Sequence, residues 1–392
     1  MSPAERYPPI RDYAVIGDCH GCALVSRDGR IDWCALQRFD ADPVFLRLLD
    51  AERGGFWEIA PVGEYRVERQ YLPDTAILQT EFITPHGRLR LTDFMPVGRK
   101  LDASTHDYVN LNAPGWLVRR LEGLSGEVAL KMRYRPSRAY AAEPVRLRRL
   151  DGRLQSEGLP VLFTDLEFEV QDDLAEASLT VTAGETRDLV LAATNAERQC
   201  PRDRVDEFLT VTTAFWQEWL GYCRYRGPHA AMVRRSALTL KLMTYAPGGG
   251  LVAALTTSLP EQIGGERNWD YRYCWLRDGC FTLYALAVLG YHGEASRFHD
   301  YLIQACGRTL PEIQIMYGID GESHLPERTL DHLSGYRDSR PVRVGNEAHT
   351  QRQMDIYGQV LDLALLYRRH GVAGVRGSYA DRAARQVSVT FG

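Results

Sequence analysis

The chain has 392 residues, of which 45% are hydrophobic and 25% are charged, and its formal net charge is -4. This length exceeds what one hydrophobic core usually serves, so we expect two domains. The near-balance of charge argues against a nucleic-acid partner, which normally requires a strong basic excess. The first ten residues lack the basic and apolar regions of a signal peptide, and the chain offers no long uncharged apolar stretch. We therefore expect a cytoplasmic protein with no membrane partner.

Residues 1–200 are predicted to form an N-terminal antiparallel β-sandwich. Short runs alternate apolar and polar residues, as in EVALKMRY at 127–134, and residues 177–193 behave similarly. Gly, Pro and Asp separate these runs, for example in TPHGR at 84–88. Because strands follow one another with hardly any helical run between them, two antiparallel sheets packed face to face are the expected architecture.

Eight cysteines are spread over the chain, and we expect reduced thiols in a protein of this size without a signal peptide. The closest pair, in CHGC at 19–22, could be combined with Cys34 and His20 into a zinc site. A structural zinc site normally needs a second ligand pair at similar spacing, and none follows. We therefore expect neither a metal nor any other cofactor, and place these residues in a strand and a turn.

The periodicity changes after residue 200. Residues 203–222 have the apolar spacing of a helix, which we place in a helical linker over 201–228. Further helices are predicted over residues 229–245, 279–290, 294–307 and 350–369. The last of them would carry Met354, Tyr357, Leu361 and Ala364 on one face. Helices that are apolar on two sides or all round are covered on more than one side, so two concentric layers of helices are expected from residue 229 onward.

One stretch of the helical part combines aromatic rings with charges. Residues 268–280, NWDYRYCWLRDGC, hold two Trp, two Tyr, two Asp and two Arg. A plain core segment would be aliphatic, because buried charges are costly unless they are paired. Rings mixed with hydrogen-bonding charges suit a ligand that has apolar faces and many hydroxyls, such as a sugar. The long connection 316–358 is also rich in Tyr, His, Asp and Arg, which is uncommon unless such a segment is functional.

Arg277 and Asp278 lie where the aromatic stretch meets the predicted helix 279–290. An Asp at a helix N-terminus can cap free N–H groups, so a purely structural role for Asp278 stays open. A cap does not explain the neighbouring Arg277 or the rings before it. The ends of inner helices form the floor of a concave pocket, which is the usual place for a small ligand.

Three stretches together resemble the bacterial and archaeal branch of glycoside hydrolase family 15, the glucoamylase and trehalase family. They are YAVIGDCHGCALVSRDGRIDWCALQRFD at 13–40, LPEQIGGERNWDYRYCWLRDGC at 259–280 and SRPVRVGNEAHTQRQMDIYG at 339–358. The resemblance covers residues 7 to about 370. It implies a β-sandwich followed by an (α/α)6 barrel, and inverting hydrolysis of α-glucosidic bonds by two glutamates acting across a water.

The substrate-binding residues that the resemblance implies are Arg277, Asp278, Trp275, Tyr273, Trp269 and Arg343. The first two would hold hydroxyls of the non-reducing glucose, Trp275 and Tyr273 would stand in the pocket wall, and Arg343 would contact the neighbouring sugar. The expected partner is therefore an α-glucoside, either a malto-oligosaccharide or trehalose. Assembly into a homo-oligomer stays open.

No catalytic residue is expected within the chain. The resemblance places the general acid after the segment matched by residues 353–366, and the base further on. Residues 372–392 match nothing in the family and contain no Glu. We therefore expect residues 229–392 to be the first part of an incomplete (α/α)6 barrel, with acid and base downstream of Gly392. A carboxylate beside Arg, such as Asp278, is held ionised, so we expect it to accept hydrogen bonds from sugar hydroxyls rather than to donate a proton.

Several functions stay open. The favoured one is a glycoside hydrolase of the glucan 1,4-α-glucosidase type. The alternatives are an α,α-trehalase of the same family, and a non-catalytic sugar-binding or defunct fragment. A phosphorylase built on the same pair of domains is disfavoured, because the sequence of residues 264–278 resembles that of the hydrolases.

Overall fold

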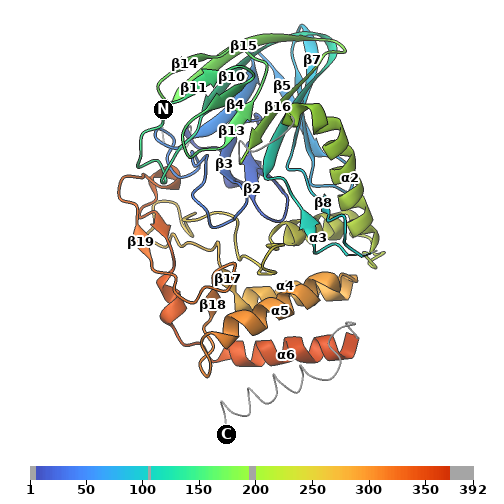
Figure 1. Cartoon of the computed structure of the whole chain (residues 1–392), viewed down its shortest axis with the longest axis vertical. Coiled ribbons are helices and arrows are strands. Elements are labelled where there is room, and N and C mark those ends of the chain that lie inside the picture. The colour runs from blue at the N-terminus through green and yellow to red at the C-terminus, as the bar shows by residue number, and fades with distance from the viewer. Residues whose placement is uncertain (1–5, 105–106, 194–199, 371–392) are drawn as a thin grey trace.

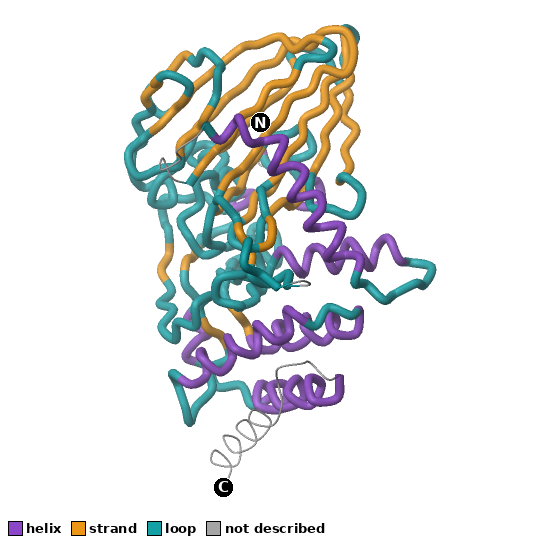
Figure 2. The backbone as a smooth tube through the Cα atoms, turned by 45° about the vertical axis from the view of Figure 1, so that its right-hand side comes forward, coloured by secondary structure: helices purple, strands orange, loops and turns teal. Residues whose placement is uncertain are grey.

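The computed structural model describes residues 6–104, 107–193 and 200–370. Strands dominate its first half, helices and long loops make up its second half, and the two parts lie one above the other (Figure 1). After a turn about the vertical axis, loops are seen between the strands and a lower layer of helices (Figure 2). None of the described helices is long and apolar enough to cross a membrane. The fourteen strands of the main sheet lie before residue 193, and the five described α-helices begin at Val205 or later.

The first part is one antiparallel sheet system whose fourteen strands lie within the described residues. They are β1 (Ala14–Gly17), β2 (Cys22–Val25), β3 (Ile31–Ala35), β4 (Phe56–Pro61), β5 (Arg66–Tyr71), β6 (Leu78–Ile83), β7 (Gly87–Phe94), β10 (Trp116–Arg135), β11 (Arg148–Leu150), β12 (Arg153–Gln155), β13 (Val161–Phe163), β14 (Glu169–Gln171), β15 (Leu174–Thr182) and β16 (Thr186–Ala192). Two shorter strands, β8 (Gly98–Arg99) and β9 (Leu111–Asn112), pair separately. An N-terminal antiparallel sheet domain, as predicted, is confirmed.

The long strand β10 holds this domain together. Its first part pairs with β7 and β16, whereas its second part pairs with β4 and β15. A core of buried side chains receives residues from both parts, for example Trp57 and Ile59 on one side and Leu91 and Leu189 on the other. The alternation read in EVALKMRY places Val128, Leu130, Met132 and Tyr134 in this core.

Five α-helices follow among the described residues: α2 (Val205–Gly221), α3 (Ala230–Leu242), α4 (Leu276–Leu289), α5 (Gly293–Gly307) and α6 (Asp355–His370). Helix α2 runs down the side of the sheet domain, while α4, α5 and α6 lie stacked below it (Figure 1). One large core joins the two parts, because Trp33 and Leu49 of the sheet domain belong to the same buried cluster as Leu238, Leu283 and Phe298 of the helices.

The last helix differs from the prediction in its start and in its buried face. A 3-10 helix, η4 (Glu347–Thr350), and an extended stretch precede it, so α6 begins only at Asp355. The predicted face was wrong, because Met354 is 68% exposed and Leu361 is 37% exposed. Ile356, Leu363 and Leu366 are buried instead. Contact with α4 and with the loops before it decides which face is covered, and periodicity alone does not identify it.

The long connection before α6 is ordered by short elements. Strand β18 (Met316–Tyr317) pairs with β17 (Cys274–Trp275), and β19 (Arg328–Thr329) pairs with β20 (Arg343–Val344). Two further 3-10 helices, η1 (Ile10–Asp12) and η2 (Pro201–Arg204), flank the sheet domain, and η3 (Tyr336–Asp338) lies within the connection. These pairings bring the connection against the aromatic stretch.

Candidate sugar-binding site

The aromatic stretch before α4 has two sides. Trp269, Tyr271 and Trp275 line a pocket of about 480 Å³. Asp270 and Arg272, which alternate with them, are fully buried and face the protein interior. Side chains of an extended segment point alternately to opposite sides, so one short sequence supplies both the pocket wall and the support behind it.

The opposite wall comes from the long connection. Its described residues in the pocket are Glu327, Asn346, Glu347, Ala348, Thr350 and Gln351. Asn346 stands at the start of η4, and its side-chain oxygen accepts the N–H of Ala348 at 3.0 Å. This N-cap fixes where the wall turns.

Arg343 lies behind one of the rings. Its guanidinium carbon is 4.3 Å from the centre of the Trp269 ring, and its Nε lies 3.0 Å from a Glu327 carboxylate oxygen. It also donates to the carbonyl groups of Glu266 and Asn268. Arg343 is not among the described residues that line the pocket. The arrangement makes it a support for Trp269 rather than an open sugar contact.

Arg277 and Asp278 lie in the first turn of α4. The N-cap position of this helix is Trp275, so Asp278 is the third helical residue and not a cap. Arg277 lies 4.0 Å from Asp278 and 3.6 Å from Asp355, and donates to the side chain of Gln353 at 3.4 Å. Both Arg277 and Asp278 are about two-fifths exposed, and neither is among the described residues that line the pocket. Partial burial raises the pKa of the Asp278 carboxyl, and the charge of Arg277 opposes that shift.

Trp275 connects the pocket to this charged pair. Its ring lines the pocket, and the Arg277 guanidinium lies 5.8 Å from the ring centre. Its indole N–H is buried and has no hydrogen-bond partner among the described residues. A buried Trp N–H usually finds a partner, so this donor is an exception to the rule.

Tyr273 is not among the described residues that line the pocket, although the resemblance implies a place in the pocket wall. It is 7% exposed and packs in a cluster with Ile315, Met316, Leu325 and Ile356. Burial raises the pKa of its hydroxyl. The substrate-binding residues predicted from the sequence included neither Tyr271 nor the residues of η4. The polar content of the long connection 316–358 indicated that this segment is functional. It did not indicate which of its residues face the aromatic stretch.

A second pocket, of about 470 Å³, adjoins the first. Thr350 and Gln351 line both, and the second is completed on one side by Gln353 and Tyr357. Since Gln353 accepts a hydrogen bond from Arg277, the charged pair at the start of α4 lies close to where the two pockets meet.

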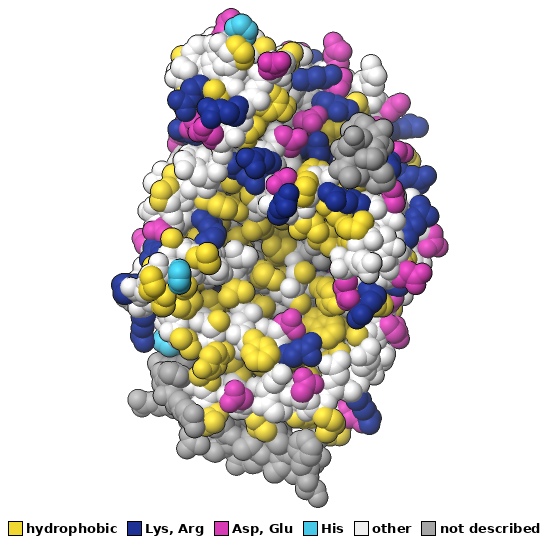
Figure 3. Space-filling model, turned by 180° about the vertical axis from the view of Figure 1, so that it is seen from behind, with side chains coloured by type: hydrophobic (Ala, Val, Ile, Leu, Met, Phe, Trp, Pro, Cys, Tyr) yellow, Lys and Arg dark blue, Asp and Glu magenta, His cyan; other side chains and the backbone are white. Residues whose placement is uncertain are grey.

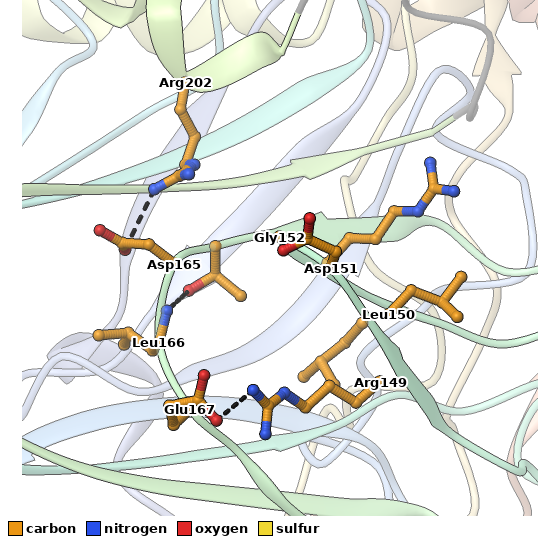
Figure 4. Close-up of a pocket in the computed structure, with 11 residues that line it drawn as sticks. Arg149, Leu150, Asp151, Gly152, Asp165, Leu166, Glu167 and Arg202 are labelled. Atoms are coloured by element: carbon orange, nitrogen blue, oxygen red, sulfur yellow. Dashed lines mark hydrogen bonds and ion pairs between the residues drawn. The ribbon is translucent and has the colours of Figure 1, made fainter.

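Another pocket, of about 580 Å³, lies on the sheet domain between the hairpin β11–β12 and the loop after β13. Its charges pair with each other, as Arg202 does with Asp165 at 3.1 Å and Arg149 with Glu167 (Figure 4). None of the described residues that line it carries an aromatic ring. It therefore lacks the flat aromatic faces against which a sugar ring packs.

The closest cysteine pair makes no metal site in the described structure. The thiols of Cys19 and Cys22 are buried and donate to the carbonyl groups of Lys241 and Leu255. No group of three or more His, Cys, Asp or Glu among the described residues could hold a metal ion.

An antiparallel sheet domain joined to a helical part, with a ring-lined pocket beside an Arg–Asp pair, has the features of a carbohydrate-active protein. Two family models match the chain. The Trehalase-like, N-terminal model covers residues 3–207, and the Glycosyl hydrolases family 15 model covers residues 227–390. The expectation that residues 372–392 match nothing in the family was therefore wrong. The chain therefore belongs to glycosyl hydrolase family 15, as the sequence motifs predicted.

Curated relatives carry the name trehalase. That of Mycolicibacterium smegmatis is 35% identical over 385 residues, which are 93% of this chain and 58% of the relative. That of Thermoplasma acidophilum is 35% identical over 364 residues, which are 91% of this chain and 60% of the relative. Trehalase 1 of Sulfolobus acidocaldarius is 31% identical over 368 residues, with 92% and 60% covered. The chain thus spans about three fifths of the length of these relatives.

Proposed function

We propose that this chain supplies the sugar-binding residues of a family 15 glycoside hydrolase that acts on α,α-trehalose. The observation that carries the proposal is the pocket lined by the rings of Trp269 and Trp275, with the Arg277 guanidinium 5.8 Å from the centre of the Trp275 ring. The relatives named trehalase favour trehalose over malto-oligosaccharides. Trehalase therefore replaces the glucan 1,4-α-glucosidase that the sequence motifs alone favoured.

The chemistry of the pocket suits a glucose unit. The apolar faces of the sugar ring would lie against Trp269 and Trp275, whose large rings remove them from water. Hydroxyl groups at the sugar edge would donate to the Asp278 carboxylate and accept from Arg277. Hydrogen bonds to charged groups contribute more than neutral ones, so this pair would fix the orientation of the sugar.

Hydrolysis needs a general acid and a base in addition to this pocket. Glu327 lines the pocket, but its carboxylate is engaged in an ion pair with Arg343 at 3.0 Å. Asp278 lies beside Arg277, and its carboxylate would accept hydrogen bonds from the sugar hydroxyls. In this proposal both catalytic carboxylates come from outside residues 1–392, and no described residue is assigned a catalytic role.

The same proposal includes the architecture, a β-sandwich followed by part of an (α/α)6 barrel. Helix α4 buries Leu283 and Leu286 but exposes Phe281, Tyr284 and Val288, at 64%, 52% and 56%. These three share one helix face, because they are three and four positions apart. Apolar side chains also gather across the middle of the rear surface (Figure 3). An apolar helix face of this kind is what the further helices of a complete barrel would cover.

The test is to measure trehalose and maltose binding to the chain by calorimetry, and glucose release in the same samples by an enzymatic assay. We expect trehalose to bind more tightly than maltose, and no glucose to be released. A folded chain that binds neither sugar would refute the sugar-binding function. Release of glucose from trehalose by the chain alone would refute the assignment of both catalytic carboxylates to another part of the protein.

A further inference from the structure

A strained turn of the sheet domain reaches the helical part. Three consecutive non-glycine residues, Ala139, Tyr140 and Ala141, have φ angles of 50°, 54° and 61°. A left-handed backbone is unfavourable for such residues, because their Cβ comes too close to the following carbonyl oxygen. Strain of this kind persists only where the surroundings hold it, and it is found disproportionately near functional sites.

Contacts on both sides hold the turn. The Tyr140 N–H donates to Asp42 of the same domain at 2.8 Å, and the Tyr140 carbonyl lies 2.8 Å from the His332 Nε2 atom of the long connection. The Tyr140 ring is 5% exposed and lies 5.7 Å from the guanidinium of Arg272 and 5.8 Å from that of Arg328. The turn therefore presents the Tyr140 side chain to the helical part in one orientation.

The hydroxyl of Tyr140 accepts a hydrogen bond from Arg272 at 2.9 Å. Arg272 is fully buried, donates to the carbonyl of Ala41 at 2.9 Å, and forms a two-pronged pair with Asp270 at 2.8 and 2.9 Å. Burial works to lower the pKa of Arg272, but the charge of Asp270 raises it well above its usual range. The sheet domain thus fixes one side of the Arg272 guanidinium, and the Asp270 carboxylate accepts hydrogen bonds from the other side.

Asp270 in turn joins the two walls of the pocket. Its carboxylate accepts the N–H of Gly345 at 3.2 Å, and its carbonyl accepts the side-chain N–H of Asn346 at 3.0 Å. Gly345 has a φ of 83°, and a Cβ there would lie 1.9 Å from the Pro326 carbonyl oxygen, so the backbone approaches this closely only without a side chain. Asn346 caps η4, which carries the second wall.

From this continuous series of contacts we propose that Tyr140 is a positioning residue for the sugar pocket. The sheet domain sets the separation of the two pocket walls through Tyr140, Arg272 and Asp270, although Tyr140 itself does not line the pocket. The proposal rests on the proposed function for its ligand, trehalose. Its consequence is that removing one remote hydroxyl shifts the rings that contact the sugar.

The test compares Tyr140→Phe with a matched control, Tyr7→Phe. The Tyr7 hydroxyl is also buried and also bridges the two parts, because it lies 3.1 Å from the Ser334 hydroxyl and accepts the Ala51 N–H at 3.0 Å. It has no contact with Asp270 or with the pocket walls among the described residues. Both variants lose a buried hydrogen bond, so both should lower the melting temperature by similar amounts.

Two readouts separate positioning from stability. In the chain labelled with 5-fluorotryptophan, we expect the fluorine resonances of Trp269 and Trp275 to shift in Tyr140→Phe and to stay in place in Tyr7→Phe, without any sugar present. Calorimetry should show trehalose binding weakened on the order of ten-fold in Tyr140→Phe and less than about two-fold in Tyr7→Phe. A milder variant, His332→Ala, loosens the same turn and should shift the same resonances if Tyr140→Phe does not fold.

The outcomes distinguish this proposal from the proposed function. If the wild-type chain binds no α-glucoside, the proposed function fails, and the fluorine resonances still decide whether Tyr140 positions the rings. If the resonances of Trp269 and Trp275 coincide with those of the wild type in both Tyr140→Phe and His332→Ala, the positioning role is refuted. Equal trehalose affinities of Tyr140→Phe and Tyr7→Phe would refute it as well.

Discussion

Replacing Asp270 by Ala should destabilise the protein strongly, because it leaves a buried guanidinium without its counter-charge. Asp270 and Arg272 are both 0% exposed, and their two hydrogen bonds measure 2.8 and 2.9 Å. Breaking a buried pair by removing one partner costs about 3–5 kcal/mol. At about 2–4 °C per kcal/mol for a unit of 150–250 residues, the melting temperature should fall by roughly 6–20 °C.

Glu261→Ala is the matched control within the same sequence motif. Glu261 pairs with Arg267 at 3.1 Å, but the two side chains are 44% and 75% exposed. Such surface pairs contribute about 0–1 kcal/mol, so the control should melt close to the wild type. Thermal unfolding of both variants, followed by circular dichroism, makes the comparison. If Asp270→Ala melts within about 2 °C of Glu261→Ala, the buried pair does not stabilise this segment and the reasoning is wrong.

Three further predictions concern the site and the exposed helix face. Arg277→Ala and Asp278→Asn should each weaken trehalose binding about ten-fold or more, since hydrogen bonds to charged groups contribute about 1.5–3 kcal/mol; wild-type affinity of both in calorimetry would contradict their sugar-binding role. Burial raises the pKa of the Asp278 carboxyl, so its ionised form lowers stability at neutral pH, and this cost disappears as the pH falls below the unfolded value of about 3.9. Asp278→Asn should therefore melt above the wild type at pH 7, and a gain that persists unchanged at pH 3 would contradict this origin. Phe281→Ser should reduce self-association in light scattering without lowering the melting temperature, because the Phe281 side chain is 64% exposed. Leu283→Ser should unfold the helix, because Leu283 is only 1% exposed. If both variants lowered the melting temperature equally, Phe281 would be covered in the folded protein.

Local patterns in the sequence determined the element types and the family. The alternation at residues 127–134 predicted a strand that became the second part of β10, and the period of residues 203–222 predicted α2. Both patterns involve side chains only a few positions apart, so they can be recognised without knowing the fold. The motifs around residues 268–280 and 339–358 identified the family for the same reason, since they are contiguous.

Only the tertiary structure decided which charges of NWDYRYCWLRD support the fold and which remain for a ligand. Residue type and spacing alone do not separate Asp270 and Arg272 from Arg277 and Asp278, although the family resemblance pointed to the last two. The partners that bury Arg272 are the Ala41 carbonyl and the Tyr140 hydroxyl, which lie 231 and 132 residues earlier in the chain. Arg277 and Asp278 meet no such distant partner from the sheet domain among the described residues and stay about two-fifths exposed. Burial depends on contacts between residues far apart in sequence, and these contacts exist only once the sheet domain and the helices have packed together.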